Sequence, residues 1–171
     1  MRSSNTAIAA TLVAAGMVSG LGSTPSAWAF DPAVNGTYTA TVVGDWAQTK
    51  GVYHQEAVVR STWTITSSCY TAQDCKGQVV SDQGWSAPLH MHDGQNWYVK
   101  RDIPNWERCP DGSSFTGTDY IYFYPANPDT GEISLGSTVM AGKEKTVGPV
   151  GVCGSNAPLW IEQPFRLDRI G

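Results

Sequence analysis

His90 and His92, separated by one residue, form the cluster in the sequence that most resembles a set of metal ligands. On a β-strand, residues i and i+2 face the same side, so both rings can reach one ion if a neighbouring strand supplies a third ligand. The alternative is that both rings lie on a solvated face, just before the turn predicted at Asp93-Gly94. His54 lies in a polar stretch and has no partner that the sequence identifies.

The sequence contains no clear catalytic motif. There is no G-x-S-x-G nucleophile elbow, and we expect the cysteines to be oxidised. A glycoside hydrolase uses two carboxyl groups that distant strands bring together, so sequence spacing does not reveal such a pair. The glutamates open to this role are Glu56, Glu107, Glu132, Glu144 and Glu162. The sequence therefore predicts no catalytic residue and no cofactor, and a non-enzymatic role is the expected one.

Aromatic side chains are abundant, with 7 Trp, 7 Tyr and 4 Phe in 171 residues. Core packing accounts for most of them, whereas Trp46, Trp106 and Trp160 fall at strand ends or in loops, where rings line ligand pockets or stack on sugars. The residues predicted to bind a ligand are Trp46, Trp85, Trp97, Tyr120, Tyr122 and Tyr124. Those predicted to point inward, around a cavity open at one end, are Tyr38, Trp85, Leu89, Trp97, Tyr122 and Ile133.

The four cysteines predict two disulfides. Cys69 and Cys75 flank a short polar connection between two strand-like runs, so a bridge there is easy to close, and this leaves Cys109 to pair with Cys153. Zinc binding by the same thiols is the alternative, but no C-x-x-C pair is present.

A secretory leader is predicted at residues 1–29, with an apolar run from Ala7 to Val18 and cleavage after Ala29. The run is shorter than a membrane span, so we expect no stable anchor and a secreted or envelope location. Residues 30–171 then form a single domain. The net charge of −4 and the scattered basic residues argue against nucleic acid as a partner. The oligomeric state stays open, as does modification of Asn35, which begins a formal glycosylation sequon.

Period-two alternation dominates this domain, which predicts an all-β fold. The expected strands are 36–46, 59–69, 78–81, 85–92, 96–103, 118–124, 132–140 and 159–170, with loops at 104–112 and 142–158. About eight short strands joined by short loops favour an antiparallel up-and-down barrel, with a β-sandwich as the alternative. Strand 118–124 is apolar on both faces, so we expect both faces to be covered. Pro164 is expected to mark a bulge or an edge.

Several short stretches also resemble known proteins: GTYTA, GDWA, VRSTWTITSSC, SDQGWSAPL, CPDG and PFRLDR. They resemble a group of small exported proteins of mycobacteria and their relatives and, to a lesser degree, the extracellular domains of mycobacterial receptor-type serine/threonine kinases. The resemblance implies export and a β domain with paired cysteines. It supplies no catalytic residue and no cofactor.

Three functions follow as hypotheses. The first is an exported, non-enzymatic barrel that binds a small apolar molecule or a component of the cell envelope. The second is a secreted or surface protein-interaction module whose interior is filled with side chains. The third is an envelope-modifying hydrolase. A cavity supports the first over the second, and a close carboxylate pair in a cleft supports the third.

Overall fold

The computed structural model describes residues 31–171, so the predicted leader and its cleavage site lie outside the described residues. Within this range the chain is almost entirely β. The elements are β1 (Gly36–Val42), η1 (Gly44–Trp46), β2 (Gln48–Thr49), β3 (Val52–Tyr53), β4 (Val59–Cys69), β5 (Cys75–Ser81), β6 (Ser86–Met91), β7 (Trp97–Arg108), β8 (Ser114–Pro125), β9 (Val139–Val147) and β10 (Trp160–Arg169). No helix among these residues is long and apolar enough to cross a membrane.

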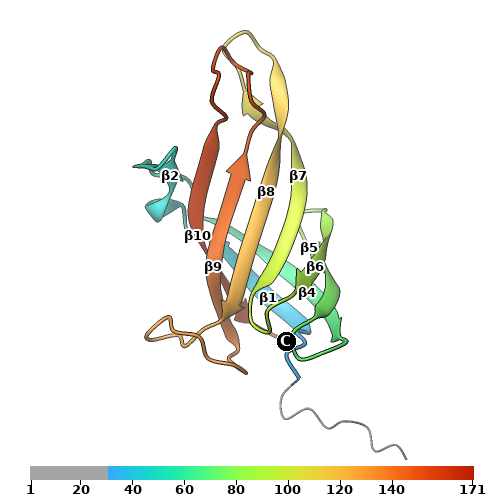
Figure 1. Cartoon of the computed structure of the whole chain (residues 1–171). Coiled ribbons are helices and arrows are strands. Elements are labelled where there is room, and N and C mark those ends of the chain that lie inside the picture. The colour runs from blue at the N-terminus through green and yellow to red at the C-terminus, as the bar shows by residue number, and fades with distance from the viewer. Residues whose placement is uncertain (1–30) are drawn as a thin grey trace, which may run out of the picture.

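Eight of the strands close into an antiparallel barrel (Figure 1). The order β1-β4-β5-β6-β7-β8-β9-β10 follows the chain, and pairing of β1 with β10 closes the circle. The short β2–β3 hairpin attaches to the start of β10, outside the circle. The predicted up-and-down barrel is therefore confirmed, and the sandwich alternative is wrong.

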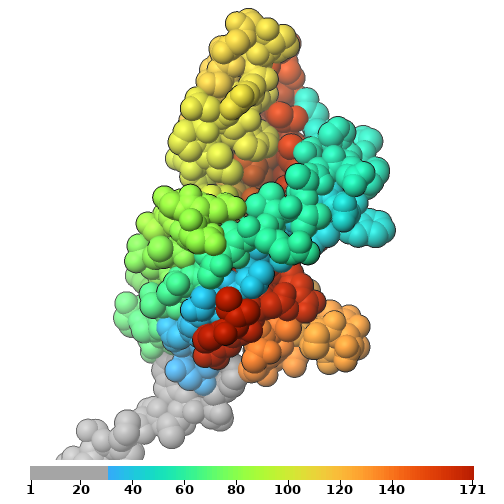
Figure 2. Space-filling view, turned by 180° about the vertical axis from the view of Figure 1, so that it is seen from behind, coloured from blue at the N-terminus to red at the C-terminus, as the bar shows by residue number. Residues whose placement is uncertain are grey.

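The two ends of the barrel differ. At one end, residues 31–35 cross the opening, where Val34 is buried in the core and its backbone N–H and C=O both bond to the Ser67 hydroxyl at 2.8 Å. The other end, which we call the mouth, lies where β1 and β5 end and β4 and β6 begin. Strands β7 and β8 continue beyond this level, and Figure 2 shows their hairpin rising above the shorter wall. The lumen therefore has one plugged end and one end with a raised rim.

Several predicted segments differ from the structure. Strand β7 runs on through Pro104 to Arg108 where a loop was predicted, because a register shift between Ile103 and Glu107 removes the need for a proline N–H. Residues 132–140 were predicted as a strand but are mostly loop, with Ile133 and Leu135 exposed.

The strand in this part of the chain is β9, at Val139–Val147, and its residues 142–147 were predicted to be loop. Its inward side chains include no large apolar one after Met140, so apolar alternation does not reveal it. Residue 142 of this strand must be glycine for a steric reason, since a Cβ there would collide with the Tyr122 carbonyl on β8. Close approach of two backbones, rather than a turn, explains this glycine.

The core fills the plugged half of the barrel. Tyr38, Leu89 and Trp97 point inward as predicted, and all three are buried. Tyr122 and Ile133 do not point inward, and that part of the prediction is wrong. On β8 the inward residues are Ile121 and Phe123, which places Tyr120, Tyr122 and Tyr124 on the outer face. Tyr120 is 45% exposed, so the expectation that this strand is covered on both faces is also wrong within residues 31–171.

Both predicted disulfides are present. Cys69–Cys75 joins the ends of β4 and β5 beside the plugged end, across a sequence separation of 6 residues. Cys109–Cys153 ties the raised β7–β8 hairpin to the loop after β9, across a separation of 44 residues. All four thiols are thereby used, so the zinc alternative is wrong.

The two bridges should differ in their effect on stability. Replacing Cys109 and Cys153 by Ser should lower the free energy of unfolding by about 4 kcal/mol, against about 2 to 3 kcal/mol for Cys69 and Cys75, because the longer loop restricts the unfolded chain more. Urea unfolding of the two double variants, with fully reduced protein as the reference, measures the difference. Equal losses would contradict the loop-length argument.

Candidate functional site

A cavity of about 220 Å³ lies inside the barrel at the level of the mouth. Its wall includes apolar side chains: Ala40, Val42, Val59, Trp63, Ile121 and Phe165. Polar or polar-tipped side chains lie among them: Ser61, Gln83, Trp85, Arg101, Glu144 and Gln163. Six of the eight barrel strands and the turn between β5 and β6 contribute, so the cavity is a property of the closed barrel rather than of one loop. We call it the lumen site.

Arg101 is the central charge of the lumen site. Its Nε donates to Asp119 Oδ2 at 2.8 Å, and a terminal nitrogen lies 4.0 Å from Glu144 Oε1. Its guanidinium also lies 4.1 Å from the centre of the Trp85 ring, in a cation–π contact. Asp119 has no exposed side-chain surface, and its other oxygen accepts a bond from the Thr146 hydroxyl. The arginine thus holds a fully buried carboxylate and shapes the cavity wall.

Two neighbouring carboxyl groups share this arginine, and they cannot both ionise at low cost. Burial, together with the negative charge of Asp119, raises the pKa of Glu144 to about 8. Burial also raises the pKa of Asp119, although Arg101 opposes that rise. Glu144 is therefore the protonated partner at neutral pH and hydrogen-bonds to Asp119.

The stability of the protein should fall as the pH rises from about 5 to 8 through this pair. The Glu144 carboxyl keeps its proton up to about pH 8 when folded but only to 4.5 when free. Between these two pH values the folded state binds more protons than the unfolded state. The stabilisation from the protonated Glu144 carboxyl is therefore complete below about pH 5 and is lost as the pH rises toward 8. Glu144→Gln should flatten the slope measured by urea unfolding at several pH values. Parallel pH curves for the two proteins would contradict the assignment.

Two polar atoms on residues that line the lumen site have no partner among residues 31–171. They are the Trp85 Nε1 donor and the Gln163 Oε1 acceptor, and both are buried. A buried polar group without a hydrogen bond costs about 1 to 3 kcal/mol, so such groups are rare in folded proteins. A molecule in the cavity that accepts from Trp85 and donates to Gln163 would remove both costs.

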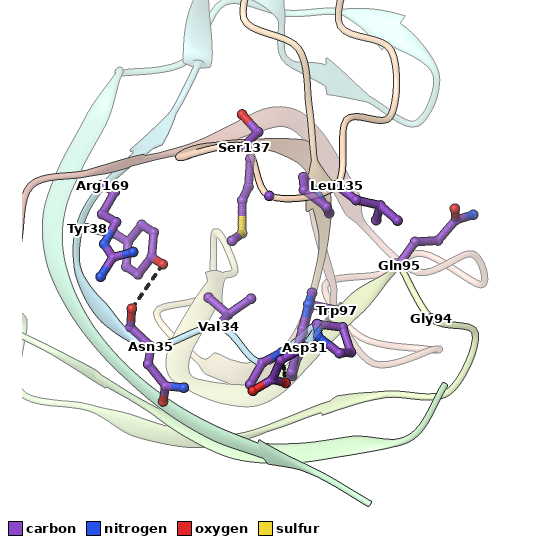
Figure 3. A pocket seen from close by; sticks show the side chains of 15 residues that line it. Asp31, Val34, Asn35, Tyr38, Gly94, Gln95, Trp97, Leu135, Ser137 and Arg169 are labelled. Carbon is purple, nitrogen blue, oxygen red and sulfur yellow. Dashed lines mark hydrogen bonds between the residues drawn. The ribbon is translucent and has the colours of Figure 1, made fainter. Parts of the chain in front are cut away.

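A second cavity, of about 250 Å³, lies at the plugged end (Figure 3). Tyr38, Trp97 and Met140 meet there with the residue 31–35 segment and the loop that carries Leu135 and Ser137. Around the labelled side chains, the Tyr38 hydroxyl bonds to the Asn35 carbonyl at 3.4 Å, and none of the unpartnered buried atoms is found in this wall. Among residues 31–171 the lumen site therefore has the stronger chemical case for a ligand.

The six residues predicted to bind a ligand do not form one site. Trp85 lines the lumen site, and Trp97 lines the second cavity from the core. Trp46 is 71% exposed on η1, outside the barrel. The three tyrosines of β8 lie on the outer face, where the Tyr124 hydroxyl bonds to the Gly131 carbonyl at 3.3 Å.

The prediction from sequence missed three polar residues of the lumen, Arg101, Asp119 and Gln163, and named Glu144 only as one of five glutamates open to glycoside hydrolysis. The alternation of strand faces could have indicated two of them. Arg101 is two residues from Val99, and Asp119 is two residues from Ile121, so each lies on the same face of its strand as a buried apolar residue. A charged residue in the buried phase of an apolar strand indicates either an ion pair or a site. Gln163 and Glu144 gave no such signal, because their strands lack clear alternation.

The candidate metal ligands lie on the outer surface. The His90 and His92 rings are 5.3 Å apart, and His92 Nδ1 is 3.1 Å from Asp74 Oδ1. Burial lowers the pKa of His90, and the charge of His92 lowers it further. Within the described part of the chain, no group of three His, Cys, Asp or Glu side chains is placed to hold an ion. The structure thus supplies no third ligand for the predicted pair among these residues.

Comparison with known proteins gives a match of structure alone. No family model matches the chain, and no curated protein matches it. Among solved structures, the monomer form of the M. tuberculosis PknI sensor domain matches with a TM-score of 0.54 and 18% identity, covering 81% of this chain and 88% of that one. This agrees with the resemblance to kinase extracellular domains noted in the sequence. The barrel described here has the fold of that sensor domain.

Proposed function

We propose that this protein is an extracellular binding module that holds one small amphipathic molecule in the lumen site. The observation that carries the proposal is the pair of unpartnered polar atoms, Trp85 Nε1 and Gln163 Oε1, on residues that line a cavity at the mouth. Other side chains of the wall, including Val42 and Phe165, are apolar. A ligand with a short apolar body and a head that both donates and accepts hydrogen bonds complements this arrangement.

This proposal narrows the ligand predicted from sequence. A purely apolar molecule would leave Trp85 and Gln163 unpaired and would cover Arg101 without compensating for its lost hydration. A cavity of about 220 Å³ is also below the usual size of drug-sized sites, so the ligand is small or enters only in part.

The extracellular location rests on separate observations. Two disulfides favour an oxidising compartment, and residues 1–29 have the pattern of a secretory leader. The matched structure is a sensor domain by its own description. Amino-terminal sequencing of the protein from culture supernatant or cell wall should begin at Phe30, and a chain that starts at Met1 would contradict export.

The hydrolase alternative has weaker support from the same geometry. A close carboxyl pair does exist, but Asp119 is fully buried against Arg101 and only Glu144 lines the cavity. Glycoside hydrolysis requires both carboxyl groups to face the sugar. The pair is therefore better suited to holding the wall of a binding site than to acid–base catalysis.

NMR titration of the Trp85 indole N–H tests the proposal. We expect octanamide, which has an acceptor for Trp85, a donor for Gln163 and a short apolar tail, to shift this resonance saturably near one equivalent. Trp85→Phe assigns the resonance. Val59→Trp, at the rim of the cavity, should abolish the shift, whereas Val80→Trp on the outer face of β5 should not.

Octanoate serves as the charged comparison, because its carboxylate would compete for Arg101. If neither probe moves the indole resonance, and the protein dimerises as its concentration rises, the filled interaction module replaces the binding module. Native mass spectrometry of protein from its own host then identifies the physiological ligand as added mass.

A further inference from the structure

We propose that the outer face of β6–β9 is a second binding surface, which takes an acidic glycan. The surface consists of His90, Tyr98, Lys100, Tyr120 and Tyr122, around a shallow cavity of about 380 Å³ on the wall that faces the viewer in Figure 1. It lies on the opposite side of the sheet from the lumen site and does not depend on the function proposed for that site.

Strand register builds a continuous row of rings across this face. His90 pairs with Tyr98, and Tyr98 pairs with Tyr122. The ring centres are 5.9 Å apart for His90 and Tyr98, which are stacked, and 6.5 Å apart for Tyr98 and Tyr122. Two residues further along, Lys100 pairs with Tyr120. Three adjacent strands thus place these rings side by side on one face.

These rings are not explained by packing. Tyr98, Tyr120 and Tyr122 are 38%, 45% and 36% exposed, whereas Ile121 and Phe123 between them already supply the core contacts of β8. None of the three tyrosine hydroxyls has a hydrogen-bond partner within residues 31–171, although the hydroxyls of Tyr38 and Tyr124 do. The faces and the hydroxyls are therefore both available to a ligand that offers C–H faces and hydroxyl groups, as sugars do.

The charge on this face favours an acidic sugar over a neutral one. Lys100, Lys143 and Lys145 are three of the five lysines of a chain whose net charge is −4, and register places them beside Tyr120 and Tyr122. The Lys100 ammonium lies 5.3 Å from the Tyr120 ring centre. Glu162 and Asp102 share the face, but Glu162 is 2.8 Å from Lys143 and Asp102 accepts a bond from Thr118. Lys100 and Lys145 have no carboxylate partner among the described residues.

A glycan fits the surface better than a protein partner does. Interfaces between proteins have an apolar centre and are depleted in lysine, and a stable one buries about 800 Å² on each side. Here the aliphatic residues Val99 and Ile121 are only 2% exposed, so the surface presents rings and ammonium groups. A nucleic acid would also stack on rings, but it needs more free cations along its backbone than this face has.

Calorimetric titration of the intact protein tests the proposal with four probes: a galacturonic acid hexasaccharide, a heparin hexasaccharide, maltohexaose and oligothymidylate. We expect at least one acidic glycan to bind about tenfold more tightly than maltohexaose, and high salt to weaken it. Tyr98→Ala/Tyr120→Ala should abolish the binding, and Lys100→Gln should weaken it. Tyr53→Ala, at an exposed tyrosine on β3, is the matched control and should change nothing.

Three outcomes would overturn the proposal: no binding of either acidic glycan, equal affinity for maltohexaose, or tighter binding of oligothymidylate. Unchanged affinity in the double tyrosine variant would also overturn it. Val59→Trp, which closes the lumen site, should leave glycan affinity unaltered. This variant separates failure of the outer surface from failure of the lumen site.

Discussion

Arg101→Met should lower the free energy of unfolding by about 3 to 5 kcal/mol at neutral pH, because it leaves the fully buried Asp119 carboxylate without its partner. Methionine keeps most of the volume of the arginine stem, so the loss reports charge pairing rather than a cavity. The cation–π contact with Trp85 is lost as well, which adds to the effect. Urea unfolding followed by far-ultraviolet circular dichroism measures the change.

Three comparisons make this result specific. Adding Asp119→Asn to Arg101→Met should recover part of the loss, because the unpaired charge is then removed. The loss should also shrink at acid pH, where Asp119 takes up a proton. Arg166→Met, which breaks the exposed pair with Asp168, should cost at most about 1 kcal/mol. Equal losses at the two arginines, or no recovery in the double variant, would contradict a buried ion pair.

The barrel was predictable because its strands alternate strongly at the places that matter. β4 alternates threonine and serine with Trp63 and Ile65, and its predicted bounds coincide with those observed. Eight strands with short connections then favour a closed meander over two packed sheets. The disulfides followed from loop lengths, since the 69–75 loop is short enough for its bridge to be assigned first.

Which face of a strand points into the barrel was harder to predict than where the strands lie in the sequence. In β8, tyrosine occupies one phase and Ile121 and Phe123 the other, so both phases are apolar and the sequence does not say which is inside. Register decides it: Phe123 pairs with Trp97, and both are in the core. Tyr122 pairs with Tyr98 and therefore shares the outer face. The inward assignment of Tyr122 was incompatible with an inward Trp97 in this register.

The lumen site was unpredictable for a related reason. Its residues come from different strands, and only the register brings Arg101 opposite Asp119 and places Glu144 beside them. Strand parity indicates that Asp119 is buried, but it does not indicate which partner compensates the charge. Because alternation is weak in β9 and β10, the sequence did not indicate that Glu144 and Gln163 face the lumen.

Trp63→Ala should cost about 3 to 5 kcal/mol and is the substitution most able to prevent folding. The side chain is 2% exposed, and its ring centre lies 5.0 Å from Phe165 and 5.2 Å from Trp85, which it meets edge to face. Its Nε1 also donates to the Ser61 hydroxyl at 3.1 Å. The indole thus joins β4 to β10 and forms the floor between the core and the lumen site.

If Trp63→Ala does not fold, its free energy of unfolding cannot be measured. Trp63→Phe therefore provides a second measurement. It retains a ring against Phe165 but loses the bond to Ser61, so we expect a smaller loss than for alanine. Trp46→Ala is the matched control: its indole is 71% exposed, and its removal should change stability by no more than about 0.5 kcal/mol. Urea unfolding gives the free energies of unfolding of the three variants, provided that the slope of free energy against urea concentration is the same for all of them. If Trp63→Ala and Trp46→Ala cost the same, the aromatic cluster below the lumen site does not hold the barrel together.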